Sequence, residues 1–418
     1  MNPDHRPLHY LVSTAGIPNL GDELIAATWL KHLAERHPEA DVVLDCIDPA
    51  ASLAPLAGLH PRLRLTSTLW QICFRNWEAG ARTREIAREV IADPSLAGDL
   101  AAGVELLRRA DVVHLTGGGF LNGIWPAFAG LLSGITAATG ISGGTAAATG
   151  LGLYPAIGGT GEIMPELTAG FDVLDVRDEP SSRLLGRPGA RSCDDVFLLP
   201  DAWLAEPGAD LPEVMVSIQS TQPPVTLFPP PSARTPGTAR GAAEPDEREL
   251  RVREARSEQG MRMLIDFAAK TLAAWGADEV GLIECWPDAD RRAWEMADDL
   301  APSVRRYPLR DVLHEGFPAV PGQTWLSTRF HPHLFAAAAG ASGVAVNLMK
   351  GYYDTKHGSL IEQGSGWSLA HYRPFDRRQE IPDRPRSGGY PPGVLAELQG
   401  RKRSVAESIY GASRGGRP

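Results

Sequence analysis

Strand-like apolar runs alternate with helical segments along this chain, and this alternation is what most constrains its fold. In the first half, apolar runs at residues 8–13, 41–46 and 111–116 are each followed by a segment of helical character. The pattern starts again in the second half, with strand-like runs at 213–219 and 280–285. Alternation with short connections predicts a parallel sheet covered by helices on both faces. Two successive sets predict an α/β protein of two Rossmann-like, doubly wound domains facing across a cleft.

This pattern also divides the chain. We assign residues 1–205 to an N-terminal domain and residues 206–380 to a C-terminal domain. Within the second, residues 221–245 form a proline-rich insertion that cannot be a helix or an inner strand. It is either a surface loop near the cleft or a neutral insertion. Residues 381–418 form a tail with seven basic residues against three acidic ones. We expect this tail to be solvated, and contact with an anionic membrane face is the alternative.

The composition argues against several functional classes. The formal charge of -10 argues against nucleic-acid binding, which usually needs a basic surface. The four cysteines are scattered without a CxxC pair, which indicates reduced thiols in a reducing compartment. The N-terminus has no apolar signal region, and no apolar run is long enough to span a bilayer. We therefore expect a cytoplasmic protein without a transmembrane segment.

A fixed cation and a titratable ring lie together in the sequence STRFHPH, residues 327–333, between an apolar run and an alanine-rich segment. Pro332 suits the first position of a helix, which places Arg329 and His331 beside a helix N-terminus. Free N–H groups and the helix dipole favour anions there. The pattern predicts acid catalysis on a phosphorylated or carboxylated substrate. We assign Arg329 and His331 as catalytic, and His333 to substrate binding.

Polar and glycine-rich turns follow the predicted strands, at the edge where such sheets bind ligands. Asn19 and Asp22 belong to the first turn and either face substrate or cap the next helix. The run Gly117-Gly118-Gly119 follows a buried strand and either offers N–H groups to a ligand or only forms a tight turn. It has neither the dinucleotide-binding nor the P-loop spacing.

Further cations accompany these turns. Arg177 ends a predicted strand, where it contacts substrate or forms a surface salt bridge. In the stretch 347–360, Lys356 and His357 can hold phosphate or carboxylate, and Tyr353 can stack against a sugar. The alternative for this stretch is an amphipathic boundary between a loop and a helix. Asp194, Asp195 and Asp201 lack the spacing of a calcium loop and a nearby histidine, so we assign no metal.

Together these motifs resemble the polysaccharide pyruvyl transferase family. The matching segments follow the family's order: NLGDELI (19–25), LTGGGFL (115–121), DVRDEPSSRLL (175–185), STRFHPHLFAAAAG (327–340) and GYYDTKHGSL (351–360). The resemblance implies a GT-B-like fold with the acceptor on the N-terminal domain and the donor on the C-terminal domain. It implies transfer of a pyruvyl group from phosphoenolpyruvate, without a cofactor, to two hydroxyls of a sugar or glycan, lipid-linked acceptors included. The products are a ketal and free phosphate.

The resemblance also implies roles for single residues. The family's catalytic histidine corresponds to His331 and its donor-binding arginine to Arg329. A further donor-contacting arginine corresponds to Gln219, and losing a guanidinium weakens bidentate binding of an anion. Either another cation substitutes or the donor differs. Ketal formation needs a proton on the methylene carbon of the enol, and we expect a protonated His331 to deliver it.

Two other functions stay open. A nucleotide-sugar glycosyltransferase on the same fold would need a diphosphate site and an acidic residue for the ribose hydroxyls, for which Glu284 is a candidate. A non-catalytic member that binds a glycan or an acidic metabolite is favoured by Gln219.

Overall fold

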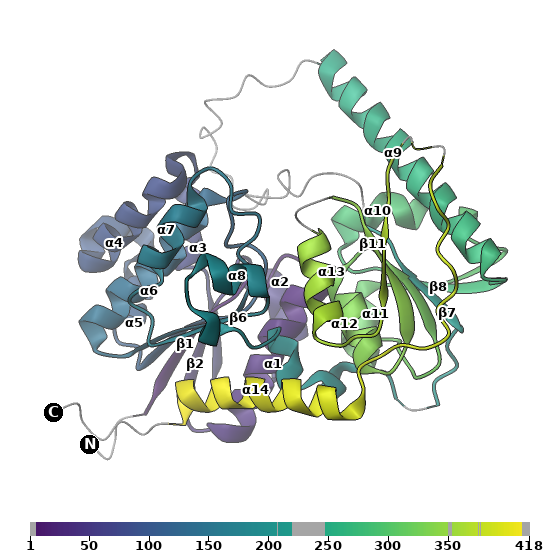
Figure 1. Ribbon diagram of the computed structural model, residues 1–418. Coiled ribbons are helices and arrows are strands. Elements are labelled where there is room, and N and C mark those ends of the chain that lie inside the picture. Colours follow the sequence, from purple (N-terminus) through teal and green to yellow (C-terminus); the bar gives the residue numbers. More distant parts are fainter. Residues whose placement is uncertain are drawn as a thin grey trace.

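The chain forms two parallel six-stranded sheets, seen side by side in the computed structural model (Figure 1). The structure describes residues 6–206, 208–219, 247–349, 353–374, 376 and 378–411. The proline-rich insertion, together with Lys350 and Tyr352, lies outside the described residues. The first sheet has the order β3-β2-β1-β4-β5-β6, with strands β1 (Leu8–Val12), β2 (Asp41–Asp45), β3 (Leu63–Thr66), β4 (Val112–Leu115), β5 (Thr145–Leu151) and β6 (Val173–Val176).

The second sheet repeats this order. It runs β12-β11-β10-β7-β8-β9, with strands β7 (Val214–Ser217), β8 (Glu279–Ile283), β9 (Ser303–Tyr307), β10 (Thr324–Ser327), β11 (Ser342–Asn347) and β12 (Ser368–His371). In both sheets the first strand in sequence lies between the second and the fourth, which is the doubly wound Rossmann order. The predicted α/β fold of two Rossmann-like domains is therefore confirmed.

Helices connect the strands and cover the sheets. Those of the first domain are α1 (Leu20–Arg36), α2 (Pro49–Leu56), α3 (Leu69–Arg75), α4 (Thr83–Ala92), α5 (Ala101–Leu107), α6 (Ala129–Ser142), α7 (Thr160–Leu167) and α8 (Glu179–Leu184). The later ones are α9 (Glu247–Ala274), α10 (Pro287–Glu295), α11 (Leu309–Glu315), α12 (Phe330–Ala338), α13 (Tyr353–Glu362) and α14 (Pro392–Tyr410). Among the described helices, none combines the length and the hydrophobicity that crossing a membrane requires.

Apolar packing joins the two domains. One cluster of buried side chains contains Leu11 and Trp29 of the first domain together with Trp325 and Phe335 of the second. The opposite face of each sheet packs its own cluster. Burial on both faces explains why the inner strands read as continuous apolar runs rather than as an alternating pattern. The continuous central cluster fixes the carboxyl ends of the two sheets relative to each other.

Helix α12 begins two residues earlier than predicted. Its first residue is Phe330 and its N-cap is Arg329, so that Pro332 occupies the third helical position rather than the first. A proline is tolerated there because the first N–H groups of a helix have no acceptor within the helix. The shift puts His331 inside the first turn.

The basic tail is not solvated, and this prediction is wrong for residues 392–410. They form α14, which runs from the second domain along the first (Figure 1). Its buried side chains include Leu398, Lys402, Ala406 and Ile409, which recur at helical spacing. The stripe is hard to recognise in the sequence because the segment is basic and one of its buried positions is Lys402. The charge of Lys402 is tolerated there because it pairs with Asp175 and Asp195.

Candidate active site

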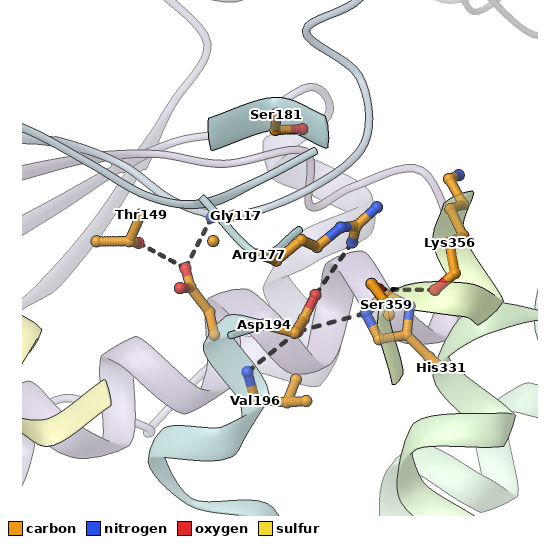
Figure 2. Close-up of polar contacts among 12 residues, drawn as sticks. Gly117, Thr149, Arg177, Ser181, Asp194, Val196, His331, Lys356 and Ser359 are labelled. Carbon is orange, nitrogen blue, oxygen red and sulfur yellow. Dashed lines mark hydrogen bonds and ion pairs between the residues drawn. The ribbon is translucent and has the colours of Figure 1, made fainter. Parts of the chain in front are cut away.

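An imidazole and a carboxylate from different domains meet between the two sheets. His331, in the first turn of α12, places Nε2 3.7 Å from Oδ1 of Asp194 (Figure 2). Asp194 caps a short 3-10 helix at Asp195–Leu198 of the first domain and is fully buried. A Cβ at Gly21 would lie 1.8 Å from Nδ1 of His331, so glycine is needed there to admit the ring. The pair therefore depends on close contact between α1 and α12.

Asp194 is held as a carboxylate. Its Oδ2 accepts a hydrogen bond of 3.0 Å from Nη1 of Arg177, and its Oδ1 accepts one of 3.2 Å from the N–H of Val196 (Figure 2). Burial acts to raise the pKa of Asp194, but the His331 imidazole, followed by Arg177 and the Val196 N–H, holds that pKa well below its usual range. The sequence gives no sign of this role, because Asp194 and His331 lie far apart in the chain. Among the described residues, no group of His, Cys, Asp and Glu side chains is arranged to hold a metal ion.

Arg177 is buried at the end of β6, so the prediction of a surface salt bridge is wrong for it. Its guanidinium lies 4.4 Å above the ring of Phe330, a residue of the other domain. Its Nε is buried and finds no hydrogen-bond partner among the described residues. A Cβ at Gly119 would lie 2.9 Å from Nη2 of Arg177 and 3.3 Å from Nζ of Lys356. The two cations thus approach each other across the glycine turn.

Lys356, on α13, is destabilised as a cation by its surroundings. Burial and then the nearby Arg177 lower its pKa to about 7, while Asp22 acts in the opposite direction. An anion bound between the two side chains would favour their charged forms and raise the pKa of Lys356. The pair draws one cation from each domain, which makes it a candidate site for a small anionic substrate.

The glycine turn acts by leaving space rather than by offering its first two N–H groups. The N–H of Gly117 donates to Oδ2 of Asp195 at 2.8 Å, and the N–H of Gly118 donates to the carbonyl of Gly150 at 3.4 Å. The predicted presentation of these two groups to a ligand is therefore wrong. The contribution of the turn lies at Gly119, where a side chain would collide with the cation pair.

The two polar residues of the first turn have separate roles. Asn19 caps α1, since its side-chain oxygen accepts a hydrogen bond of 3.2 Å from the N–H of Gly21. Asp22 faces the cations instead. Burial raises the pKa of Asp22, and His331, Thr14, Lys356 and Arg177 limit the rise. Only Asp22 of this turn therefore belongs to the charged cluster.

Arg329 is neutralised within its own domain. Its Nε donates to Oδ1 of Asp290 at 3.1 Å, and its Nη2 contacts the same oxygen. The other oxygen of Asp290 accepts hydrogen bonds from the N–H groups of Cys285 and Trp286. The ion pair is buried and anchors the loop after β8. A donor-binding role for Arg329 stays a prediction. The cation that contacts Asp194 beside His331 is Arg177, which comes from the first domain.

Gln219 and Tyr353 lie near this ion pair. Gln219 is almost fully buried, and its N–H donates to Oγ1 of Thr328 at 2.9 Å. A side-chain hydrogen bond from Gln219 and the charge of Arg329 both act against the burial that raises the pKa of Tyr353. An uncharged amide therefore occupies the position where the resemblance implies an arginine, and it pairs with a phenol rather than with an anion.

His333 and His357 do not belong to the site, which corrects their assignment to substrate binding. Both side chains are fully buried, with their Nδ1 atoms 3.1 Å apart. His333 also bonds Ser365 at 2.8 Å and stacks on Trp367 with ring centroids 4.3 Å apart. Burial lowers the pKa of His357 to about 4 and that of His333 well below its ordinary value. They are neutral packing residues between α12, α13 and the loop before β12.

Known structures resemble this chain over nearly its whole length, at low identity. They include a UDP-GlcNAc 2-epimerase from Neisseria meningitidis bound to UDP-GlcNAc (9% identity, 98% of this chain and 100% of that chain, TM-score 0.49). A second UDP-N-acetylglucosamine 2-epimerase has 11% identity over 99% of this chain and 98% of its own, with a TM-score of 0.48. A spinosyn rhamnosyltransferase complexed with thymidine diphosphate has 13% identity, 96% and 91% coverage, and a TM-score of 0.38. These likenesses are too distant to bear on function.

A family comparison is more specific. No protein of curated function matches the chain in sequence. The model of the family described as polysaccharide pyruvyl transferase matches residues 19–226, a range that contains Asp22, the glycine turn, Arg177 and Asp194. The match therefore covers the part of the site that the first domain contributes. On this match, and on motifs in the family's order, the chain belongs to the polysaccharide pyruvyl transferase family of transferases.

Proposed function

We propose that this transferase moves the pyruvyl group of phosphoenolpyruvate onto two hydroxyls of a sugar or glycan, with His331 as the general acid. One observation carries the proposal: Arg177 and Lys356 converge from two domains, and Arg177 also binds the carboxylate that holds the imidazole of His331. Phosphoenolpyruvate needs cations for its phosphate and carboxylate, and it needs a proton for its methylene carbon. The site combines both within one cluster.

The cation pair supports one of the two alternatives that Gln219 leaves open, namely that another cation substitutes for the missing arginine. An anion at this pair would lie beside the buried guanidinium of Arg177 and the half-buried amine of Lys356, and attraction between charges screened from solvent is stronger than in water. Among the described residues, the buried Nε of Arg177 has no hydrogen-bond partner, so it can donate to a bound anion. Binding would also return Lys356 to its charged form at neutral pH, because its pKa is lowered to about 7 in the free protein. These two cations supply positive charge that the amide of Gln219 cannot.

The proton transfers follow from the chemistry of the substrate. His331 gives a proton to the methylene carbon, and the positive charge that develops at the adjacent carbon is trapped by the first hydroxyl. The second hydroxyl then displaces phosphate. Two hydroxyl protons are released: one replaces the proton that His331 gave, and the other leaves with phosphate. The ionised Asp194 attracts an imidazolium and orients the ring for the first step.

The test is a reaction of the purified protein with phosphoenolpyruvate and a pool of hydroxylated acceptors. We expect release of phosphate and the mass gain of a pyruvate ketal by mass spectrometry. The variant His331→Ala should lower turnover by about a hundredfold or more. His314→Ala, which removes an exposed histidine on α11, is the matched control. Near-normal turnover by His331→Ala would remove His331 from the acid role.

The glycosyltransferase alternative is separated by the same assay. Its candidate ribose ligand, Glu284, already accepts a hydrogen bond of 3.0 Å from the N–H of Leu309 through Oε2. That carboxylate supports the loop before α11. Consumption of nucleotide sugars without phosphate release from phosphoenolpyruvate would favour the alternative over the pyruvyl transfer.

A further inference from the structure

The proposed reaction needs a base as well as an acid. The first acceptor hydroxyl must lose its proton as its oxygen bonds to the former enol carbon. His331 cannot take that proton in the same step, because it is delivering its own to the methylene carbon. A second titratable group with access to the acceptor must therefore lie in the cluster, and general bases usually contribute about a hundredfold or more to such a step.

Most acidic groups of the cluster are already committed. Both oxygens of Asp194 serve Arg177, Val196 and His331, and its depressed pKa makes it a weak base. Asp178 caps α8, with Oδ1 accepting a hydrogen bond of 2.8 Å from the N–H of Ser181. Neither group can take a proton from substrate without giving up a contact that the fold uses.

Asp22 is placed differently. It lies in the first turn of α1, in the domain to which the acceptor is assigned, and it is only partly buried. Its Oδ1 is 3.8 Å from where a Cβ at Gly118 would be. The next glycine of that turn borders the cations of Arg177 and Lys356. The residue before Asp22 is Gly21, which contacts the ring of His331. Asp22 thus borders both the anion site and the acid.

We infer that the carboxylate of Asp22 is the general base that removes the proton of the first acceptor hydroxyl. This inference rests on the proposed function. The O–H bond breaks, its electron pair forms the new bond between oxygen and carbon, and the proton ends on Asp22. The methylene carbon meanwhile gains the proton of His331. Transfer of a proton from Asp22 back to His331 restores the site after phosphate has left with the second hydroxyl proton.

The electrostatics of Asp22 agree with this role. Burial raises its pKa, so the carboxylate is a stronger base than one on the surface, while His331, a hydrogen bond with Thr14, Lys356 and Arg177 limit the rise. Asp194, whose pKa is depressed, and Asp22, whose pKa is raised, therefore have different roles although both lie near His331.

The test is Asp22→Asn, which keeps the shape and removes the base. We expect the turnover number for ketal formation to fall about a hundredfold, while the affinity for phosphoenolpyruvate, measured by titration calorimetry, stays the same or increases because an anion has been removed from beside the cations. Asp288→Asn, an exposed acid in the first turn of α10, should leave both quantities unchanged. As a second variant, Asp22→Ala should recover turnover when formate is added as an external base.

The outcomes separate the two proposals. A wild-type protein that makes no ketal with any acceptor defeats the proposed function itself. Ketal formation by wild type and equally by Asp22→Asn overturns the role of Asp22 alone. Loss of phosphoenolpyruvate binding together with turnover, without rescue of Asp22→Ala by formate, would assign Asp22 to donor positioning and overturn its role as base.

Discussion

Replacing Lys402 by methionine should destabilise the protein strongly, although this residue touches no part of the substrate site. The ammonium of Lys402 is fully buried between Asp175 and Asp195, 3.0 Å from Oδ1 of the latter. Breaking a buried ion pair by removing one partner costs about 3–5 kcal/mol, because a charge is left uncompensated. Here two carboxylates lose their cation. Burial already raises the pKa of Asp175, so this group would take up a proton in the variant and relieve part of the cost.

We therefore expect a loss near the lower end of that range, about 3 kcal/mol. At roughly 2–4 °C per kcal/mol for a domain of this size, the melting temperature should fall by about 6–12 °C. Calorimetry or a circular dichroism melt gives the change directly. Lys270→Met is the control, since Lys270 pairs with Asp266 on the exposed face of α9 and should change stability by less than about 0.5 kcal/mol.

A double variant sharpens this test. Adding Asp175→Asn to Lys402→Met removes one of the two unpaired carboxylates, and Asn keeps an oxygen for the N–H of Gly150, which now donates to Asp175 at 3.0 Å. The double variant should thus be more stable than Lys402→Met alone. A melting temperature of Lys402→Met equal to that of wild type, or a double variant that melts lower than the single one, would refute the reasoning.

Three other predictions follow from the structure. The pKa of Lys356 is lowered to about 7, and a bound anion raises it, so phosphoenolpyruvate should bind with uptake of protons at pH 8. Its affinity should weaken by up to about tenfold per pH unit above 7. Calorimetry in buffers of different ionisation heat measures the uptake, and finding none would contradict this prediction. Burial raises the pKa of Glu23 to about 8, so the folded protein keeps a proton that the unfolded chain releases, and stability should fall by up to about 1.4 kcal/mol per pH unit between about pH 5 and 8. Glu23→Gln should flatten that slope in urea unfolding, and an unchanged slope would contradict it. Gly21→Ala would place a methyl 1.8 Å from Nδ1 of His331 and should lower turnover about a hundredfold, whereas Gly140→Ala, on the open face of α6, should not.

The fold could be predicted from sequence because its main signal is local. Parallel strands covered on both faces must be apolar at every position, and the run ending at Leu115 shows this directly, with all four residues of β4 buried. The position of α14 could not be predicted in this way. Its apolar stripe is interrupted by the charged Lys402. The burial of this side chain is explained only by its pairing with Asp175 and Asp195 of the first domain, which lie far away in the sequence.

The site could be predicted only in part, for two physical reasons. His331 can be predicted because a helix start has a local signature, but Asp194 lies far away in the sequence, in the other domain, and nothing near it indicates the contact. The assignment of His333 failed because adjacency in sequence is not adjacency in space. Residues two apart on a helix lie on different faces, so when His331 points to the other domain, His333 must point into its own.

The order of Asp194 and Asp195 in the chain links the stability of the fold to the chemistry of the site. Asp194 holds Arg177 and His331, while Asp195 accepts hydrogen bonds from the N–H of Gly117 at 2.8 Å and binds Lys402. Neighbouring residues at the start of one short helix cannot move independently, so the position of α14 is transmitted to the imidazole and to the glycine turn. Since α14 packs on the first domain through Lys402, the site is complete only after both domains and this helix have come together.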